Sequence, residues 1–162
     1  GRLDMIVVNR YGTSALRGED VLGEVETLLV GRPGRLALAQ GKSVPLRALQ
    51  GVPLVLPAVP NGLRSVLEVL CRKHGMTLDI AMEVDTATSM KEVAASGHAF
   101  TLLPMTAVDQ EVKAGVLAAW RLTNPGIRRT IALGLSHHHP LSEGARLVAS
   151  RVKALATGLL GR

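Results

Sequence analysis

The stretch that decides the fold is Gly51-Val-Pro-Leu-Val-Leu-Pro-Ala-Val-Pro-Asn-Gly-Leu-Arg64. Its apolar residues 53–56 predict a buried strand, and the proline-bounded loop at 57–61 opens a helix at about Leu63. The first backbone N–H groups of a helix lack intrahelical partners and lie at the positive end of the helix dipole, so they attract anions such as carboxylates. The stretch therefore predicts a strand–loop–helix seat for a small ligand.

The composition predicts a folded core without a nucleic-acid surface. The chain has 162 residues, of which 47% are hydrophobic, enough for one ordinary domain or two small lobes. Trp120, Tyr11 and Phe100 are its only large aromatics, so the stacking platforms of single-strand nucleic-acid binders are missing. The formal charge is +6, but the basic residues are scattered, which favours a solvated basic surface over a polyanion site.

Cysteine content and hydropathy indicate the cellular location to expect for the chain. Cys71 is alone, so the chain forms neither an intrachain disulfide nor a thiolate metal site, and we expect a reducing, cytoplasmic location. No stretch approaches the roughly 18 apolar residues of a membrane span, and we expect no membrane partner. The chain begins at Gly1 and enters a strand pattern within a few residues, which we interpret as a piece of a longer protein.

Alternating apolar runs and helical periodicities predict a mixed chain. We expect strands at 3–8, 24–30, 53–56, 79–84, 100–103, 116–122 and 128–135, a helical turn at 45–49, and helices at 63–74, 86–97, 107–114 and 142–160. This alternation predicts an α/β sheet with parallel neighbours and helices on both faces. Ligands in such sheets bind beyond the carboxyl ends of strands, and the ends at Leu56-Pro57 and Leu103-Pro104 converge on one cleft.

The helix that follows residues 79–84 has a polar start. Asp85 or Thr86 is expected to cap it, and Thr86, Thr88 and Ser89 place hydroxyls in its first turn beside free N–H groups. That arrangement suits a carboxylate or another polar ligand, but it is equally typical of plain helix capping. Asn61 and Gly62 carry the same two interpretations.

Motifs for nucleotide and metal binding are not supported. Six residues separate Gly34 from Gly41, where the phosphate-binding loop needs four. The run His137-His138-His139 lacks carboxylate or cysteine ligands at a fixed spacing, and a surface turn is favoured over a metal site. We therefore predict no metal and no cofactor.

Catalytic groupings are equally weak. Glu83 and Asp85 share a strand face, but Asp85 fits helix capping better than acid/base work. His74, Ser96 and His98 are not accompanied by a strained nucleophile turn. No catalytic residue is predicted.

Several segments occur together in a familiar order along the whole chain. They are Gly1-Arg-Leu-Asp-Met-Ile-Val7, Glu26-Thr-Leu-Leu-Val30, Leu54-Val-Leu-Pro-Ala-Val-Pro-Asn-Gly-Leu-Arg64, Glu83-Val-Asp85, Val93-Ala-Ala-Ser-Gly97, Leu102-Leu-Pro104 and Arg128-Arg-Thr-Ile-Ala-Leu133. The ordered set resembles the effector-binding domain of LysR-type transcriptional regulators. One departure is Gly97-His-Ala99, where the family more usually has Gly-x-Gly, and alanine narrows the backbone freedom before Phe100.

The resemblance implies a type 2 periplasmic-binding-protein-like α/β fold, with two lobes joined by crossover strands near 26–35 and 123–133. Residues 1–35 would be the first part of lobe I, 36–122 lobe II, and 123–162 the crossover and return to lobe I. Lobe I would be incomplete, because the family's first strand and helix, with their ligand loop, lie upstream of the segment at Gly1.

The resemblance also implies an effector site in the cleft between lobes. Its lobe II side would be formed by the loop before the first long helix, by the start of the next helix, and by one strand residue. These residues are Pro57, Ala58, Val59, Pro60, Asn61, Asp85, Thr86, Thr88, Ser89 and Thr101.

The function implied is that of a non-catalytic sensory domain in a bacterial regulator. It would bind a small polar or anionic metabolite and transmit binding to a DNA-binding domain outside this chain, so that DNA is contacted only through that domain. A homo-oligomer is expected for the full-length protein. The alternatives are a solute-binding protein of a transport system with the same two-lobe fold, and an enzyme on the same scaffold.

Overall fold

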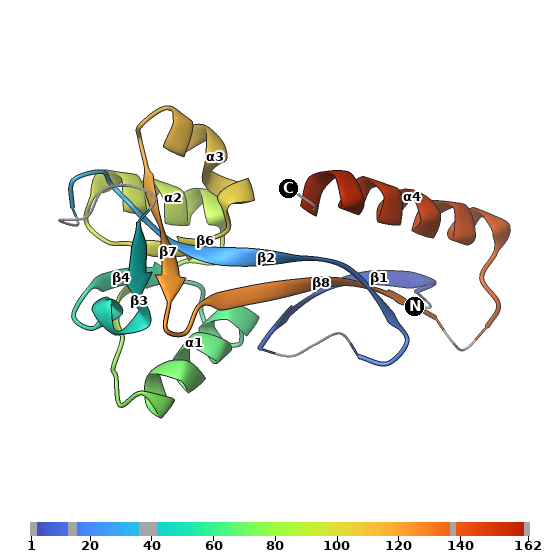
Figure 1. The fold of residues 1–162 in the computed structure, drawn as a ribbon, viewed down its shortest axis with the longest axis horizontal. Coiled ribbons are helices and arrows are strands. Elements are labelled where there is room, and N and C mark those ends of the chain that lie inside the picture. Colours follow the sequence, from blue (N-terminus) through green and yellow to red (C-terminus); the bar gives the residue numbers. More distant parts are fainter. Residues whose placement is uncertain (1–2, 13–15, 36–41, 137–138, 161–162) are drawn as a thin grey trace. The chain divides into compact units, whose positions relative to one another are not determined.

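The computed structural model describes residues 3–12, 16–35, 42–136 and 139–160, and it is a mixed α/β structure (Figure 1). The strands are β1 (Met5–Tyr11), β2 (Glu19–Gly31), β3 (Ser43–Pro45), β4 (Pro53–Leu56), β5 (Asp79–Glu83), β6 (Thr101–Leu103), β7 (Ala118–Thr123) and β8 (Ile127–Leu135). The helices are α1 (Gly62–Lys73), α2 (Ala87–Ser96), α3 (Met105–Lys113) and α4 (Glu143–Leu160), with a 3₁₀ turn, η1, at Leu46–Leu49.

The chain divides into two compact units. Unit 1 comprises Gly1–Val25 and Arg128–Arg162, and unit 2 comprises Glu26–Ile127. The lobe boundaries expected from the sequence, at 35/36 and 122/123, stay predictions. Among the described residues, no helix is both long and apolar enough to cross a bilayer.

Strand direction in unit 2 corrects the expectation of parallel neighbours. The pairs β4–β5 and β3–β7 are parallel, but β2 pairs antiparallel with both β6 and β7. The same β2 residues, 28–30, pair on both edges, so β2 is inserted between two strands that run in one direction. Strands β6 and β7, which α3 connects, therefore run parallel to each other, but β2, a strand from earlier in the chain, lies between them.

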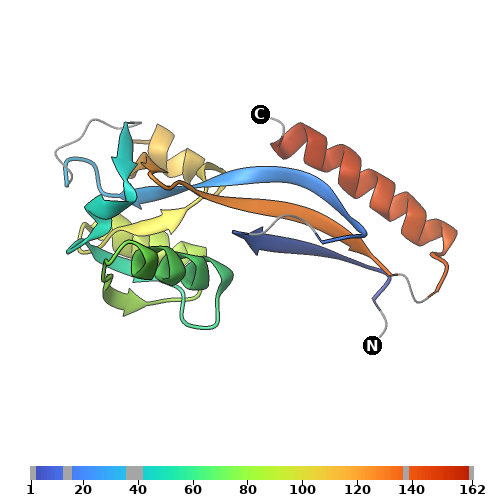
Figure 2. The same ribbon diagram turned by 60° about the horizontal axis from the view of Figure 1, so that its bottom comes forward.

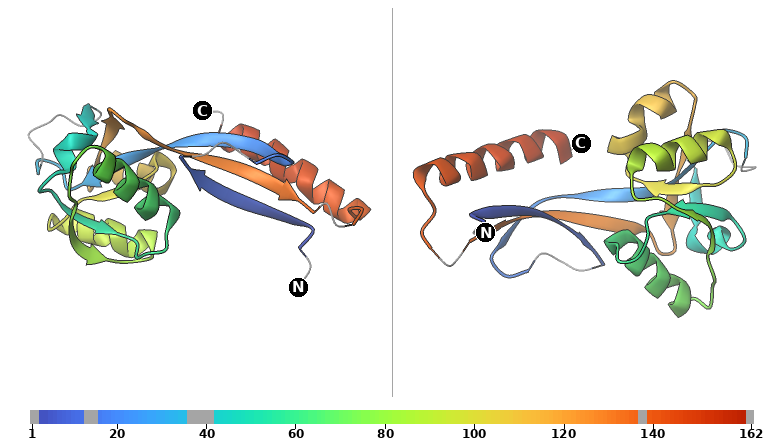
Figure 3. Two further views of the ribbon diagram at one scale, coloured as in Figure 1. Left: turned by 90° about the horizontal axis from the view of Figure 1, so that it is seen from below. Right: turned by 180° about the vertical axis from the view of Figure 1, so that it is seen from behind.

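Helices cover both faces of the β4–β6 region, as the sequence predicts. Figures 1 and 3 show α1 on one face and α2 with α3 on the other. The α2 and α3 side has an aliphatic core, and Lys91 of α2 forms an ion pair with Glu111 of α3. The core residues on this side are Leu28, Val30, Val55, Met90, Ala94, Ala99, Leu103, Val108, Leu117 and Ala119.

Two aromatic side chains anchor the centre of unit 2. Phe100 and Trp120 meet edge to face with ring centroids 6.1 Å apart, and Trp120 is only 1% exposed. Gly31 lies against this pair, because a Cβ atom built there would overlap the Phe100 ring. The position of Phe100 therefore requires glycine on β2.

Most predicted helices are confirmed, with shifts at their ends. Helix α2 ends at Gly97, whose φ of +84° is the left-handed conformation that commonly ends a helix, and Ser142 caps α4 by accepting from the Ala145 N–H at 3.1 Å. Helix α3 begins two residues earlier than expected. Strand β2 starts at Glu19, not residue 24, because its first half pairs with β8 although none of its side chains there is fully buried.

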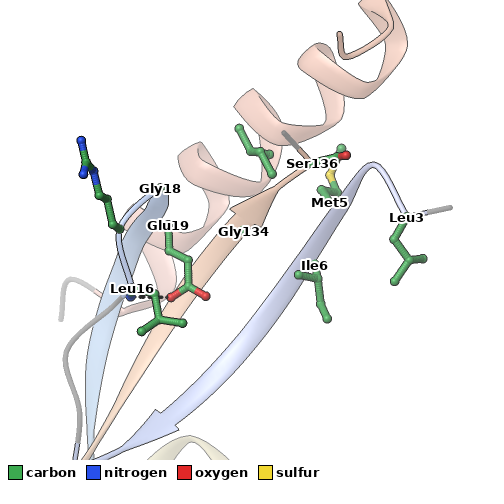
Figure 4. A pocket seen from close by; sticks show the side chains of 10 residues that line it. Leu3, Met5, Ile6, Leu16, Gly18, Glu19, Gly134 and Ser136 are labelled. Carbon is green, nitrogen blue, oxygen red and sulfur yellow. Dashed lines mark hydrogen bonds between the residues drawn. The ribbon is translucent and has the colours of Figure 1, made fainter. Parts of the chain in front are cut away.

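Unit 1 contains β1 and β8 in an antiparallel pair, from Met5↔Leu135 to Tyr11↔Arg129. Helix α4 lies along its strands (Figure 2), where Lys153 Nζ lies 2.7 Å from Asp20 Oδ2. A shallow pocket of about 330 Å³ lies beside β1 (Figure 4). It is lined mainly by apolar side chains and glycine, with the Glu19 carboxylate at one side.

The Glu19 carboxylate in unit 1 is held by two partners. It forms an ion pair with Arg10 and also accepts a hydrogen bond from the Leu16 N–H at 2.9 Å, drawn in Figure 4. The hydrogen bonds from Arg10 and then from Leu16 lower the pKa of Glu19 from 4.5 to about 2.

This shift predicts an acid-sensitive contribution to stability. Because the folded carboxylate binds its proton less readily than the unfolded one, the contribution is complete above pH 4.5 and disappears as the pH falls toward 2. Glu19→Gln should therefore lower the free energy of unfolding at pH 7 and flatten its pH dependence in that window, as measured by urea titration with circular dichroism. Asp20→Asn, in an exposed ion pair, is the control and should leave the profile near wild type.

Gly31→Ala should strain the aromatic pair. Overpacking of this kind costs about 1–3 kcal/mol, since Phe100 is buried and has little room to move. Urea unfolding followed through Trp120, the only tryptophan, measures the loss. Gly144→Ala meets no atom within 4 Å and should be neutral or slightly stabilising; equal losses for both variants would contradict the packing argument.

Candidate functional site

The loop between β4 and α1 leaves the sheet at Pro57, which is buried, and then reaches the surface. Ala58 is half-buried, whereas Val59 is 61% exposed and Pro60 is exposed after a cis Val59–Pro60 bond. Asn61 ends the loop as the cap of α1, with its side-chain oxygen accepting from the N–H groups of Leu63 (2.9 Å) and Arg64 (3.4 Å). The Asn61 amide oxygen is thus already occupied by the helix start.

The junction between β5 and α2 lies beside that loop. Val84 N–H donates to the Leu56 carbonyl at 2.9 Å, which continues the β4–β5 pairing to the end of the strands. The next residue, Asp85, does not cap α2; its Oδ1 accepts from the Ala58 N–H at 3.1 Å. The structure thus joins the two predicted ligand segments by a direct hydrogen bond.

Thr86 is the cap of α2. Its Oγ1 accepts from the Ser89 N–H at 3.2 Å and donates to the Ser89 hydroxyl at 3.0 Å. The first turn of α2 contains no acidic residue, and no hydrogen bond within the described chain engages the N–H groups of Ala87 and Thr88 or the Thr88 hydroxyl. These donors are exposed at the positive end of a helix, an arrangement that attracts anions.

Thr101, also predicted as a site residue, lies in the core. Its side chain is fully buried on β6, and its hydroxyl donates to the Val55 carbonyl at 2.9 Å. The structure therefore brings the loop 57–61 and the segment 85–89 together at the surface, while Thr101 supports β4 from beneath.

The sequence interpretation gave Arg64 no role, yet its guanidinium joins three elements. It donates to Glu68 Oε1 on α1 (2.6 Å), to Glu83 Oε1 at the end of β5 (2.8 Å) and to the Pro57 carbonyl (3.3 Å). Burial lowers its pKa, but the hydrogen bonds to Glu68 and Glu83 outweigh this and leave the pKa raised. Of these three contacts, only the ion pair with Glu68 could be predicted from the sequence, because the two residues are four positions apart on one helix.

The rejected catalytic groupings gain no support from the geometry. Glu83 is engaged by Arg64, and the Ser96 hydroxyl donates to the Val93 carbonyl at 2.6 Å beside His98 Nδ1 at 2.8 Å. Cys71 is buried, and burial followed by the charge of Glu68 raises the pKa of its thiol, which disfavours the reactive thiolate.

Metal and nucleotide sites can be assessed only in part. Over residues 3–12, 16–35, 42–136 and 139–160, no group of three or more His, Cys, Asp or Glu side chains is arranged to hold a metal ion. His137 and His138 lie outside the described residues, as do positions 36–41 of the rejected phosphate-loop motif. His139 Nε2 lies 3.6 Å from Asp4 Oδ1.

Comparison with known families gives one match over nearly the whole chain. Residues 1–156 match the model of the LysR substrate binding domain. An uncharacterized HTH-type transcriptional regulator, YfeR of Shigella flexneri, is 26% identical over 155 residues, covering 96% of this chain and 49% of the relative. The chain thus spans about half the length of this curated relative.

Solved structures share the fold. The Synechocystis CcmR regulatory domain in complex with 2-PG has a TM-score of 0.76 at 16% identity, over 94% of this chain and 73% of that one. The QuiR effector binding domain in complex with shikimate has a TM-score of 0.73 at 15% identity, over 96% and 72%. These likenesses confirm the periplasmic-binding-protein-like α/β class expected from the sequence.

Asn61 and Thr86 form helix caps, whereas the Thr88 side chain has no described hydrogen bond, so substitutions at these positions should differ in their effect on the free energy of unfolding. Asn61→Ala and Thr86→Ala each remove a helix cap and should lower the free energy of unfolding of unit 2 by about 1 kcal/mol. Thr88→Ala removes no described hydrogen bond and should change it by less than about 0.5 kcal/mol. Urea titration followed by Trp120 fluorescence distinguishes them, and a loss at Thr88 equal to that at Thr86 would contradict the assignment.

Proposed function

This chain belongs to the LysR substrate-binding domain family, and from that premise we propose that it is the effector-sensing domain of a bacterial transcriptional regulator. The match to a regulator domain favours this function over that of a transport-system solute-binding protein with the same fold. LysR domains are typically non-enzymatic, and we propose that this one performs no catalysis.

One observation carries the proposal: the Ala58 N–H to Asp85 hydrogen bond joins the β4–α1 loop to the start of α2 in a single exposed wall. We propose that the wall binds a small polar or anionic metabolite. The free N–H groups of Ala87 and Thr88 and the Thr88 hydroxyl would hold a carboxylate or comparable group. That related domains have been solved with 2-PG and with shikimate, a carboxylate, supports this ligand class.

The proposed site residues divide by what they already contact. Thr88 would meet the ligand with its N–H and hydroxyl, and Ser89 only with its hydroxyl proton, because its N–H and hydroxyl oxygen already contact Thr86. Asn61 and Thr86 hold the two helix starts. Asp85 fixes the loop and leaves its second oxygen for a ligand hydroxyl. The remaining members shape the wall or support it from the core: Pro57, Ala58, Val59, Pro60 and Thr101.

We further propose how binding becomes regulation. A ligand that binds one conformation more tightly shifts the population toward that conformation. The difference in binding free energy between the two conformations sets how strongly a distant part of the protein responds. DNA contact would come from a domain outside this chain, in a homo-oligomeric, cytoplasmic protein. The resemblance to HTH-type regulators supports that arrangement.

A panel of small carboxylates and sugar phosphates, including shikimate and 2-PG, tests the proposal by thermal shift and calorimetry on the full-length protein. The best binder should lose about tenfold in affinity in Thr88→Ala, the cost of one hydrogen bond to a charged group. Thr106→Ala is the matched control, since Thr106 is also an exposed second residue of its helix, α3. Equal losses in both variants, or no binder in a broad panel, would count against the proposed site.

A further inference from the structure

Arg64 donates hydrogen bonds to three acceptors in unit 2. Its side chain is 11% exposed, and its acceptors belong to three separate parts of the chain. Glu68 is on the same helix, Glu83 ends β5, and the Pro57 carbonyl opens the β4–α1 loop. A planar guanidinium presents several donors in a fixed fork, so one Arg side chain can hold all three acceptors at once.

The loop is therefore tied twice to the same junction. Arg64 connects Pro57 to Glu83, and the Asp85 carboxylate holds the N–H of the next loop residue, Ala58. Glu83 and Asp85 lie on either side of Val84, whose N–H donates to the Leu56 carbonyl. The two loop residues that follow Leu56 are thus each held by a neighbour of Val84: Pro57 through Arg64 and Glu83, and Ala58 through Asp85.

Apolar packing holds the outer part of the loop only weakly. Val59 is 61% exposed and Pro60 is exposed, so little buried surface fixes residues beyond Ala58. The conformation of the loop consequently depends on polar ties at its base. The Arg64 guanidinium, itself largely buried, supplies one of these ties through the Pro57 carbonyl, and the Asp85 carboxylate supplies the other through the Ala58 N–H.

We propose that Arg64 is a positioning residue for effector binding: its fork holds the β4–α1 loop against the β5–α2 junction, so that both segments of the wall are in register before a ligand arrives. This inference rests on the proposed function of that wall. Preorganisation of this kind raises affinity because the ligand does not have to order the loop on binding.

Hydrogen–deuterium exchange of the full chain without ligand tests the positioning directly. Arg64→Lys keeps the charge but loses the fork, and it should speed exchange about tenfold in peptides covering 57–61 and 84–89. Peptides covering β6 and β7 should exchange as in wild type. Arg72→Lys, the same change at an exposed site on the same helix, should change neither region.

A second variant keeps the test decisive if Arg64→Lys folds poorly. Glu83→Ala removes only the acceptor on β5 and leaves the Arg64 pair with Glu68 intact, and it should speed exchange in the same two segments by a smaller factor. Unchanged exchange in both variants would overturn the inference. So would a uniform increase that includes β6 and β7, because it would assign Arg64 to general stability.

Ligand binding separates this inference from the proposed function. With shikimate or 2-PG as probe, Arg64→Lys should weaken binding about tenfold while Thr88 and its N–H group remain in place. If neither probe binds the wild type but the loop exchanges faster in Arg64→Lys, the positioning role is supported and only the proposed ligand class fails. If a probe binds wild type and Arg64→Lys equally, the inference is overturned even though the function holds.

Discussion

The pairing of β2 residues 28–30 on both edges is the constraint on which unit 2 depends. Leu28 lies opposite Leu103 on one side and Arg121 on the other, and the inner faces of these strands are almost fully buried. This central strand fixes β6, and β6 in turn fixes β4 through the Thr101 hydroxyl and the Leu54–Phe100 bridge. The loop after β4 has a defined starting point because the strand that leads into it is held this way.

The β4–α1 loop and the β5–α2 junction are held together by hydrogen bonds between N–H donors and side-chain acceptors. Each helix start leaves N–H groups unpaired, and each is partly satisfied by a side chain, Asn61 for α1 and Thr86 for α2. Asp85 and Arg64 then link the two starts across the strand ends. The N–H groups of Ala87 and Thr88 and the Thr88 hydroxyl stay exposed at the start of α2, and these are the donors that the proposed function assigns to a ligand.

Local signals in the sequence were sufficient for most elements near the wall. The apolar run at 53–56 forms β4, and the polar residues Asn61 and Thr86 cap the helices that follow them; each of these signals acts within a few residues. Strand direction was not local: β2 precedes the β6–α3–β7 crossover by many residues, and no property of that crossover shows that a strand lies inside it. Asp85 likewise fits a cap in sequence, but its carboxylate reaches Ala58 on another strand end.

By itself, the sequence determined the family, the aliphatic core and the starts of α1 and α2, because periodicity, capping and motif order are properties of short segments read in sequence. Only the tertiary structure decided that Thr101 is a buried support, that Asp85 joins the two segments and that Arg64 holds their base. Those roles depend on contacts between residues 7 to 46 positions apart, whose distance in space is set by strand pairing and not by sequence separation.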